Sequence, residues 1–85
     1  MKKVVIYTGP ICNFCSAAKH LISKKKIKYE EIDIGSNIEK RDEMLKKSNG
    51  AKTIPQIFIC ENHIGGYVEL KSLENKGELD ILLKD

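Results

Sequence analysis

The chain has 85 residues, of which 41% are hydrophobic and 32% charged, and its formal net charge is +3 at pH 7. This balance predicts a single folded domain over residues 1–85 and excludes disordered, collagen-like and fibrous chains. The longest apolar run, residues 4–7, is far shorter than the roughly 20 residues of a membrane span, and no signal-peptide pattern follows Met1. We therefore expect no membrane partner, and the small positive charge without a dense basic stripe predicts no nucleic-acid partner.

The first half of the chain predicts a strand, a helix and a second strand. Residues 4–7 are β-branched and aromatic, which is typical of a strand buried on both faces, and we expect this strand at the centre of a sheet. Apolar residues then recur at helical spacing from about residue 13 to about residue 25. Residues 28–34 mix apolar with acidic side chains, which predicts a strand at or near a sheet edge.

A second helix is predicted from Ser36 to about Ser48. Ser36 and Glu39 have the spacing of a capping box, in which the hydroxyl and the carboxylate satisfy backbone N–H groups at a helix start. We therefore expect Ser36 to cap this helix.

The last third predicts a hairpin and a broken helix. Residues 56–60 and 63–64 flank a short turn at Glu61–Asn62, and leucines at helical spacing from Val68 onward are interrupted by Gly77. The element order is β-α-β-α-β-β-α. Since a βαβ crossover pairs its strands in parallel and a hairpin pairs them antiparallel, the sequence predicts an α/β fold with a four-stranded mixed sheet flanked by helices.

The cysteines indicate chemistry rather than structural crosslinking. The count of three is odd, and Cys12 and Cys15 enclose only two residues, so a disulfide between them would stabilise the fold little. A C-x-x-C pair between a strand and a helix is typical of a redox motif, and without an export signal we expect the reducing cytoplasm. At the helix start, free N–H groups should hold the pKa of the Cys12 thiol below its usual range. Cys12 would then attack a disulfide sulfur, and Cys15 would resolve the mixed disulfide.

Zinc is the competing interpretation of such a pair. A closed zinc site needs four ligands, and the remaining candidates, Cys60, His20 and His63, are scattered single residues. We therefore expect no metal. Cys60, at the end of an apolar strand, is interpreted as a small buried hydrophobic residue, His20 as a surface residue and His63 as a turn residue.

Four motifs in this order resemble the glutaredoxins, and the short chain is similar to the bacterial dithiol members of the glutaredoxin 3 type. They are Tyr7-Thr8, Cys12-Asn13-Phe14-Cys15 followed by Ala18-Lys19, residues 53–59 (Thr-Ile-Pro-Gln-Ile-Phe-Ile), and His63-Ile64-Gly65-Gly66. The resemblance covers nearly the whole chain. It implies a thioredoxin-like fold and a glutathione-dependent oxidoreductase that reduces protein disulfides and glutathione mixed disulfides.

The resemblance also implies a glutathione site. The proline would be cis and would hold the backbone of the preceding residue extended beside Cys12, where glutathione could add as a short strand. The Gly-Gly segment would offer N–H groups to the γ-glutamyl carboxylate, and an acidic residue would hold the γ-glutamyl amine. The lysine common before the motif is replaced here by Gly9-Pro10, which leaves two other cations for the glycyl carboxylate. The implied glutathione contacts are Phe14, Arg41, Lys52, Thr53, Ile54, Pro55, Gly66, Tyr67, Val68 and Glu69.

Two other functions stay open at this point. In one, two subunits carry a [2Fe–2S] cluster through Cys12 and two glutathiones, an arrangement that the lack of proline in the motif favours. In the other, a thioredoxin reductase supplies the electrons, although thioredoxins usually carry a tryptophan before their motif and this chain has none. We expect a monomer whose partners are glutathione and disulfide-containing or glutathionylated proteins.

Overall fold

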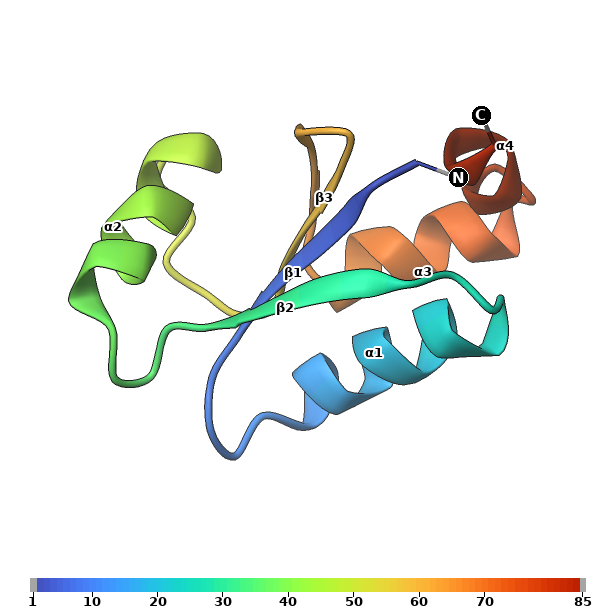
Figure 1. Cartoon of the computed structure of the whole chain (residues 1–85). Helices are drawn as coiled ribbons and strands as arrows, with labels where there is room; N and C mark the ends of the chain where they lie inside the picture. Colours follow the sequence, from blue (N-terminus) through green and yellow to red (C-terminus); the bar gives the residue numbers. More distant parts are fainter. Residues whose placement is uncertain (1, 85) are drawn as a thin grey trace.

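The computed structural model describes residues 2–84 and has one four-stranded sheet in the order β2-β1-β3-β4 (Figure 1). The strands are β1 (Val4–Thr8), β2 (Tyr29–Asp33), β3 (Gln56–Ile59) and β4 (Asn62–Gly65). β1 pairs with β2 in parallel, whereas β3 runs antiparallel to both β1 and β4. The predicted mixed sheet, with the first strand inside and the second at an edge, is confirmed.

Four helices cover the sheet on its two faces (Figure 1). They are α1 (Asn13–Lys24), α2 (Ile38–Lys47), α3 (Tyr67–Asn75) and α4 (Leu79–Leu83). α1, α3 and α4 lie on one face and α2 on the other. The predicted break falls at Gly77, between α3 and α4. None of the helices found in residues 2–84 is long and apolar enough to cross a bilayer.

The core lies in two layers because side chains alternate across the strands. On the α1 side, Val4 and Ile6 of β1 belong to the larger apolar cluster, with side chains of α1, α3 and α4. On the α2 side, Tyr7 packs edge-on against Phe58, with ring centroids 5.5 Å apart, and Met44 of α2 completes the smaller cluster. The first strand is therefore apolar on both faces, as its sequence predicts.

The predicted cap of the second helix is wrong by one residue. Asn37 is the N-cap, and its side-chain oxygen accepts a hydrogen bond from the Lys40 N–H at 3.1 Å. The Asn37 N–H donates to the Ile34 carbonyl at 3.4 Å and closes a turn that contains Ser36. Ser36 therefore lies inside the turn, and Asn37 is the first residue with the geometry of a helix cap. Asparagine caps a helix as well as serine does.

The predicted hairpin turn is also displaced by one residue. Cys60 and Glu61 occupy the turn, with φ of +50° and +66°, and β4 begins at Asn62. His63 lies in a strand, opposite Phe58, as the predicted hairpin requires, and only its separate interpretation as a turn residue is wrong. Cys60 is exposed rather than buried, because the turn carries it beyond the end of β3.

Candidate active site

The motif cysteines lie at the junction of β1 and α1. Cys12 is the N-cap of α1, and its sulfur accepts a hydrogen bond from the Cys15 backbone N–H at 3.0 Å. The preceding Ile11 has a φ of +50° and is fully exposed, so the chain turns sharply and presents Cys12 at the surface. A thiolate in this position would be stabilised by the N–H group and by the positive end of the helix dipole.

The two cysteines differ sharply in exposure. Cys15 is 2% exposed, whereas Cys12 is partly exposed. A disulfide joins them, with the Cα atoms 5.2 Å apart. The pair can therefore pass between a dithiol and a disulfide, with only Cys12 open to an incoming partner.

The loop that precedes β3 lies against Cys12. Its Ile54–Pro55 peptide bond is cis, as the resemblance implies, and the Ile54 carbonyl oxygen is 4.0 Å from the Cys12 sulfur. Within residues 2–84, no backbone group of Ile54 hydrogen-bonds to another backbone group. A peptide-like ligand bound at Cys12 could therefore pair with the Ile54 backbone, as an added strand does.

The start of α3 closes the other side of the site. Gly66 is the N-cap of α3, and a Cβ on this residue would lie 3.4 Å from the Pro55 carbonyl oxygen, so the helix start packs closely on the cis-proline loop. The Gly66 N–H donates to the Glu69 carboxylate at 2.6 Å. Gly65 has a φ of +120°, a conformation that favours glycine. The sequence did not predict the bond from Gly66 to Glu69. This bond places the Glu69 carboxylate at the helix start, where an anion would also bind.

Two aromatic rings connect the cysteine motif to α3. Phe14 is 60% exposed and stacks on Tyr67, with the centroids 5.9 Å apart and the planes at 23°. With Val68, which is 68% exposed, they line a groove of about 460 Å³ that continues along α3 past Lys71. Sequence reasoning missed Lys71, although it follows Tyr67 by four residues and so had to share its helix face.

Arg41 and Lys52 are the two cations that the family resemblance implies for the glycyl carboxylate. Both are exposed, Arg41 on α2 and Lys52 in the segment between α2 and β3. No ion pair or side-chain hydrogen bond of either residue is found within residues 2–84. The structure thus brings together the cysteine pair, Phe14, the cis-proline loop and the start of α3.

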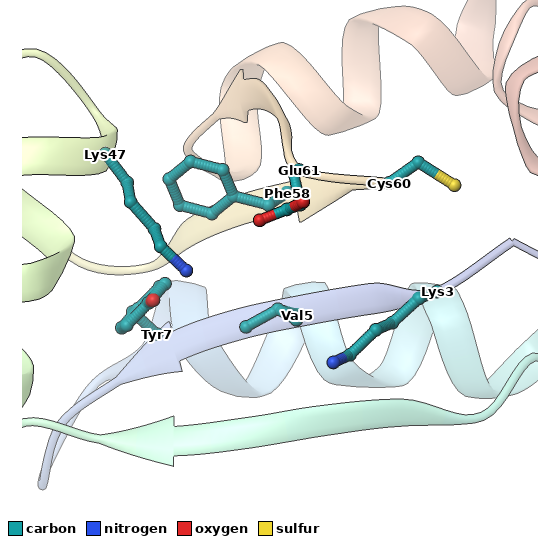
Figure 2. Close-up of a pocket in the computed structure, with 7 residues that line it drawn as sticks. All are labelled: Lys3, Val5, Tyr7, Lys47, Phe58, Cys60 and Glu61. Atoms are coloured by element: carbon teal, nitrogen blue, oxygen red, sulfur yellow. The ribbon is translucent and has the colours of Figure 1, made fainter.

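A second groove, of about 440 Å³, lies on the α2 face of the sheet (Figure 2). It is lined by Tyr7 and Phe58, with Lys3 and Lys47 beside them, and Cys60 lies at one end with its sulfur turned away from Lys47. Neither motif cysteine lines this groove. It is therefore separate from the redox chemistry of the helix start.

Comparison with known proteins decides the family. The glutaredoxin family model matches residues 4–64. The chain belongs to the glutaredoxin family. It is 48% identical over 84 residues to glutaredoxin 3 of Escherichia coli K12, covering 99% of this chain and 100% of that protein. Glutaredoxins are thiol–disulfide oxidoreductases, and in this glutaredoxin the Cys12–Cys15 pair is the redox centre.

Solved structures agree with this assignment. A glutaredoxin from Brucella melitensis superposes with a TM-score of 0.85 at 45% identity, covering 99% of this chain and 90% of that one. A buckwheat glutaredoxin–glutathione complex superposes with a TM-score of 0.85 at 26% identity, covering 96% of this chain and 76% of that one. The predicted thioredoxin-like fold and the predicted family are therefore confirmed.

Proposed function

We propose that this glutaredoxin transfers electrons from glutathione to protein disulfides and to glutathione mixed disulfides. The observation that carries the proposal is the junction of β1 and α1. The Cys12 sulfur accepts a hydrogen bond from a backbone N–H at the helix start, while Cys15 is buried one turn inside. This arrangement provides one accessible, stabilised thiolate and one shielded resolving thiol.

For a glutathione mixed disulfide, the proposed cycle uses Cys12 alone. The Cys12 thiolate attacks the glutathione sulfur, the substrate leaves as a thiolate, and glutathione remains bonded to Cys12. A second glutathione thiolate then attacks the bound glutathione sulfur. Glutathione disulfide is released and the Cys12 thiolate is regenerated, so each turnover consumes one free glutathione, and the other half of the glutathione disulfide comes from the substrate.

For a protein disulfide, the proposed cycle uses both cysteines. Cys12 attacks one sulfur and forms a mixed disulfide with the protein, and the other protein sulfur leaves as a thiolate. Cys15 loses its proton and attacks the Cys12 sulfur, which releases the reduced protein and forms the Cys12–Cys15 disulfide. Two glutathiones return that disulfide to the dithiol.

We propose that glutathione binds between the cis-proline loop and the start of α3. Its cysteine part would pair with the Ile54 backbone, whose groups lack backbone partners within residues 2–84. The γ-glutamyl carboxylate would bind N–H groups at the start of α3, at Tyr67 and Val68, and the amine would bind the Glu69 carboxylate. The buckwheat glutaredoxin, which is bound to glutathione, supports this use of the fold.

Other contacts belong to the same proposal. Phe14 is exposed beside Cys12 and would pack on the ligand, while Thr53 and Pro55 would shape the loop. Arg41 and Lys52 are the proposed cations for the glycyl carboxylate, because Gly9 and Pro10 leave none before the motif. We further propose a monomeric single domain acting in the cytoplasm, where a reducing glutathione pool can drive the reaction.

The cluster-carrier function would need more than one copy of this chain. No group of three or more histidine, cysteine or acidic side chains able to hold a metal is found within residues 2–84. An iron–sulfur cluster would therefore need thiolates from a second copy or from glutathione in addition to Cys12. Anaerobic assembly with iron, sulfide and glutathione tests this directly, and a brown dimer with visible absorption would favour the carrier function.

The test of the proposed function compares two electron sources. We expect NADPH oxidation when a small glutathione mixed disulfide is supplied with glutathione and glutathione reductase. We expect little NADPH oxidation when thioredoxin reductase replaces glutathione and glutathione reductase. Turnover with thioredoxin reductase alone would overturn the proposal in favour of a thioredoxin-like protein.

A further inference from the structure

A hydrogen-bonded chain of three side chains links the outer strand β4 to the loop beside the active site. His63 Nε2 lies 2.6 Å from Gln56 Oε1, and Gln56 Nε2 lies 2.9 Å from the Thr53 carbonyl oxygen and 3.2 Å from Thr53 Oγ1. Gln56 is 3% exposed, so its amide is shielded from water that could replace these partners. The His63 ring also packs on Phe58, with the centroids 5.0 Å apart.

The chemistry of the partners fixes which atoms of Gln56 and His63 donate in these hydrogen bonds. A carbonyl oxygen can only accept, so the end of the Gln56 amide that faces Thr53 must be its NH₂ group. The other end, Oε1, therefore faces His63 and needs a donor. Neutral His63 must then carry its proton on Nε2, because only that tautomer donates to Gln56.

This series of hydrogen bonds ends at the loop segment that lies against Cys12. Thr53 directly precedes Ile54, whose carbonyl oxygen is 4.0 Å from the Cys12 sulfur. We infer that His63 is a positioning residue: by holding the Gln56 amide in one orientation, it fixes Thr53 and thereby presents the Ile54 backbone to glutathione. The inference rests on the proposed glutathione site and adds a residue on the far strand of the hairpin to it.

Loss of the histidine donor leaves the Gln56 amide two possible responses. If the amide keeps its orientation, Oε1 is buried without a donor, which is costly. If the amide rotates by half a turn, Oε1 faces the Thr53 carbonyl oxygen and repels it. Rotation breaks the bonds to Thr53 and is favoured by the cost of the unpaired buried oxygen, whereas the Cys12 sulfur and its N–H donor are untouched.

The test compares His63→Phe, which keeps a ring on Phe58 but removes the donor, with His63→Gln, which keeps a donor. We expect His63→Phe to raise the apparent KM for a glutathione mixed disulfide about threefold to tenfold and to change kcat less than about twofold. His63→Gln should restore KM to within about twofold of wild type. His20→Phe, at an exposed position on α1, is the matched control and should change neither constant.

A double-mutant cycle separates positioning from general destabilisation. Gln56→Met removes the amide while keeping its length, so adding His63→Phe to it should raise KM no further. An unchanged KM in His63→Phe, or an equal rise with and without the glutamine, would overturn the inference. Melting temperatures of all variants show which of them fold.

Nitrogen NMR of His63 tests the geometry independently of turnover. We expect the Nε2–H tautomer in the neutral wild-type protein and a shift of the Thr53 and Ile54 amide signals in His63→Phe. The Nδ1–H tautomer would overturn the inference even if the enzyme is active. Absent glutathione-dependent turnover combined with the Nε2–H tautomer would instead refute the proposed function and leave the side-chain contacts intact.

Discussion

Replacing Cys15 with serine should separate the two reactions proposed for this glutaredoxin. The hydrogen bond to the Cys12 sulfur comes from the Cys15 backbone N–H, at 3.0 Å, and serine keeps that group. A hydrogen bond to a charged acceptor contributes about 1.5–3 kcal/mol, which is a factor of roughly ten to a hundred in the acid dissociation constant of the thiol. The Cys12 thiolate should therefore be as stable in Cys15→Ser as in the dithiol protein.

The two substrates should then respond differently. Reduction of a small glutathione mixed disulfide needs only Cys12, so Cys15→Ser should keep it within about threefold of wild type. Reduction of a protein disulfide needs an internal resolving thiol, and without it the rate should fall at least about tenfold, because escape then depends on glutathione from solution. Cys12→Ser should abolish both reactions, since a serine hydroxyl is not ionised at neutral pH.

The third cysteine must be replaced before these variants are assayed. Cys60 is exposed and would react with any alkylating probe, so every variant is made in a Cys60→Ser background. The rate of alkylation by iodoacetamide as a function of pH reports the Cys12 thiolate. Turnover is followed with glutathione and glutathione reductase on a small mixed disulfide and on a protein disulfide.

Two results would refute this reasoning. Turnover of the glutathione mixed disulfide in Cys12→Ser would show that another group is the nucleophile. A loss of more than about tenfold in Cys15→Ser on that same substrate, with the alkylation profile unchanged, would show that Cys15 acts in the step assigned to glutathione.

The remaining predictions concern charges around the ligand site and beneath α2. Glu69→Gln keeps an oxygen for the Gly66 N–H but removes the charge proposed for the glutathione amine, so KM for glutathione should rise about fivefold without a change in melting temperature. Arg41→Ala should raise the same KM about twofold at low salt and less at high salt, as steady-state kinetics at two ionic strengths would show. Burial and Glu43 raise the pKa of Tyr7, and the Tyr7 hydroxyl in turn lowers the pKa of Glu43 below its ordinary 4.5. The stability from this bond is complete above pH 4.5 and is lost as pH falls through the lower folded value, so urea unfolding should show an acid decline that Tyr7→Phe flattens.

Much of the site could be predicted because its parts are local in sequence. Cys12 and Cys15 are one helical turn apart, so the position of a strand and a helix on either side was enough to place both sulfurs at a helix start. The cis peptide bond at Pro55 followed from the family resemblance. The bond from Gly66 to Glu69 has ordinary capping spacing and was within reach of the same reasoning, but the acidic side chain was interpreted only as a ligand contact.

The features that could not be predicted depend on individual backbone hydrogen bonds and on helix packing. Ser36 and Asn37 are adjacent and both suit a helix cap, so the choice between them was made by the Asn37 N–H, which closes a turn onto Ile34. The positions of Arg41 and Lys52 depend on how α2 and the segment after it lie against the sheet, which no local pattern of charges reports.

The displaced hairpin turn shows how one residue of backbone register changes the chemistry of a site. With the predicted turn at Glu61–Asn62, His63 would face Cys60. Cys60 lies two residues, or about 7 Å, farther along β3 from Gln56 than Phe58 does. With the observed turn, Phe58 faces His63 instead. Residues 56, 58 and 60 share a face of β3, so both registers put the imidazole on the side of the sheet that carries Gln56, but only the observed register brings it within 2.6 Å of the Gln56 amide. The same shift that exposes Cys60 thus creates the contact between the outer strand and the loop at Cys12, and a hairpin variant that moves the turn should lose both together.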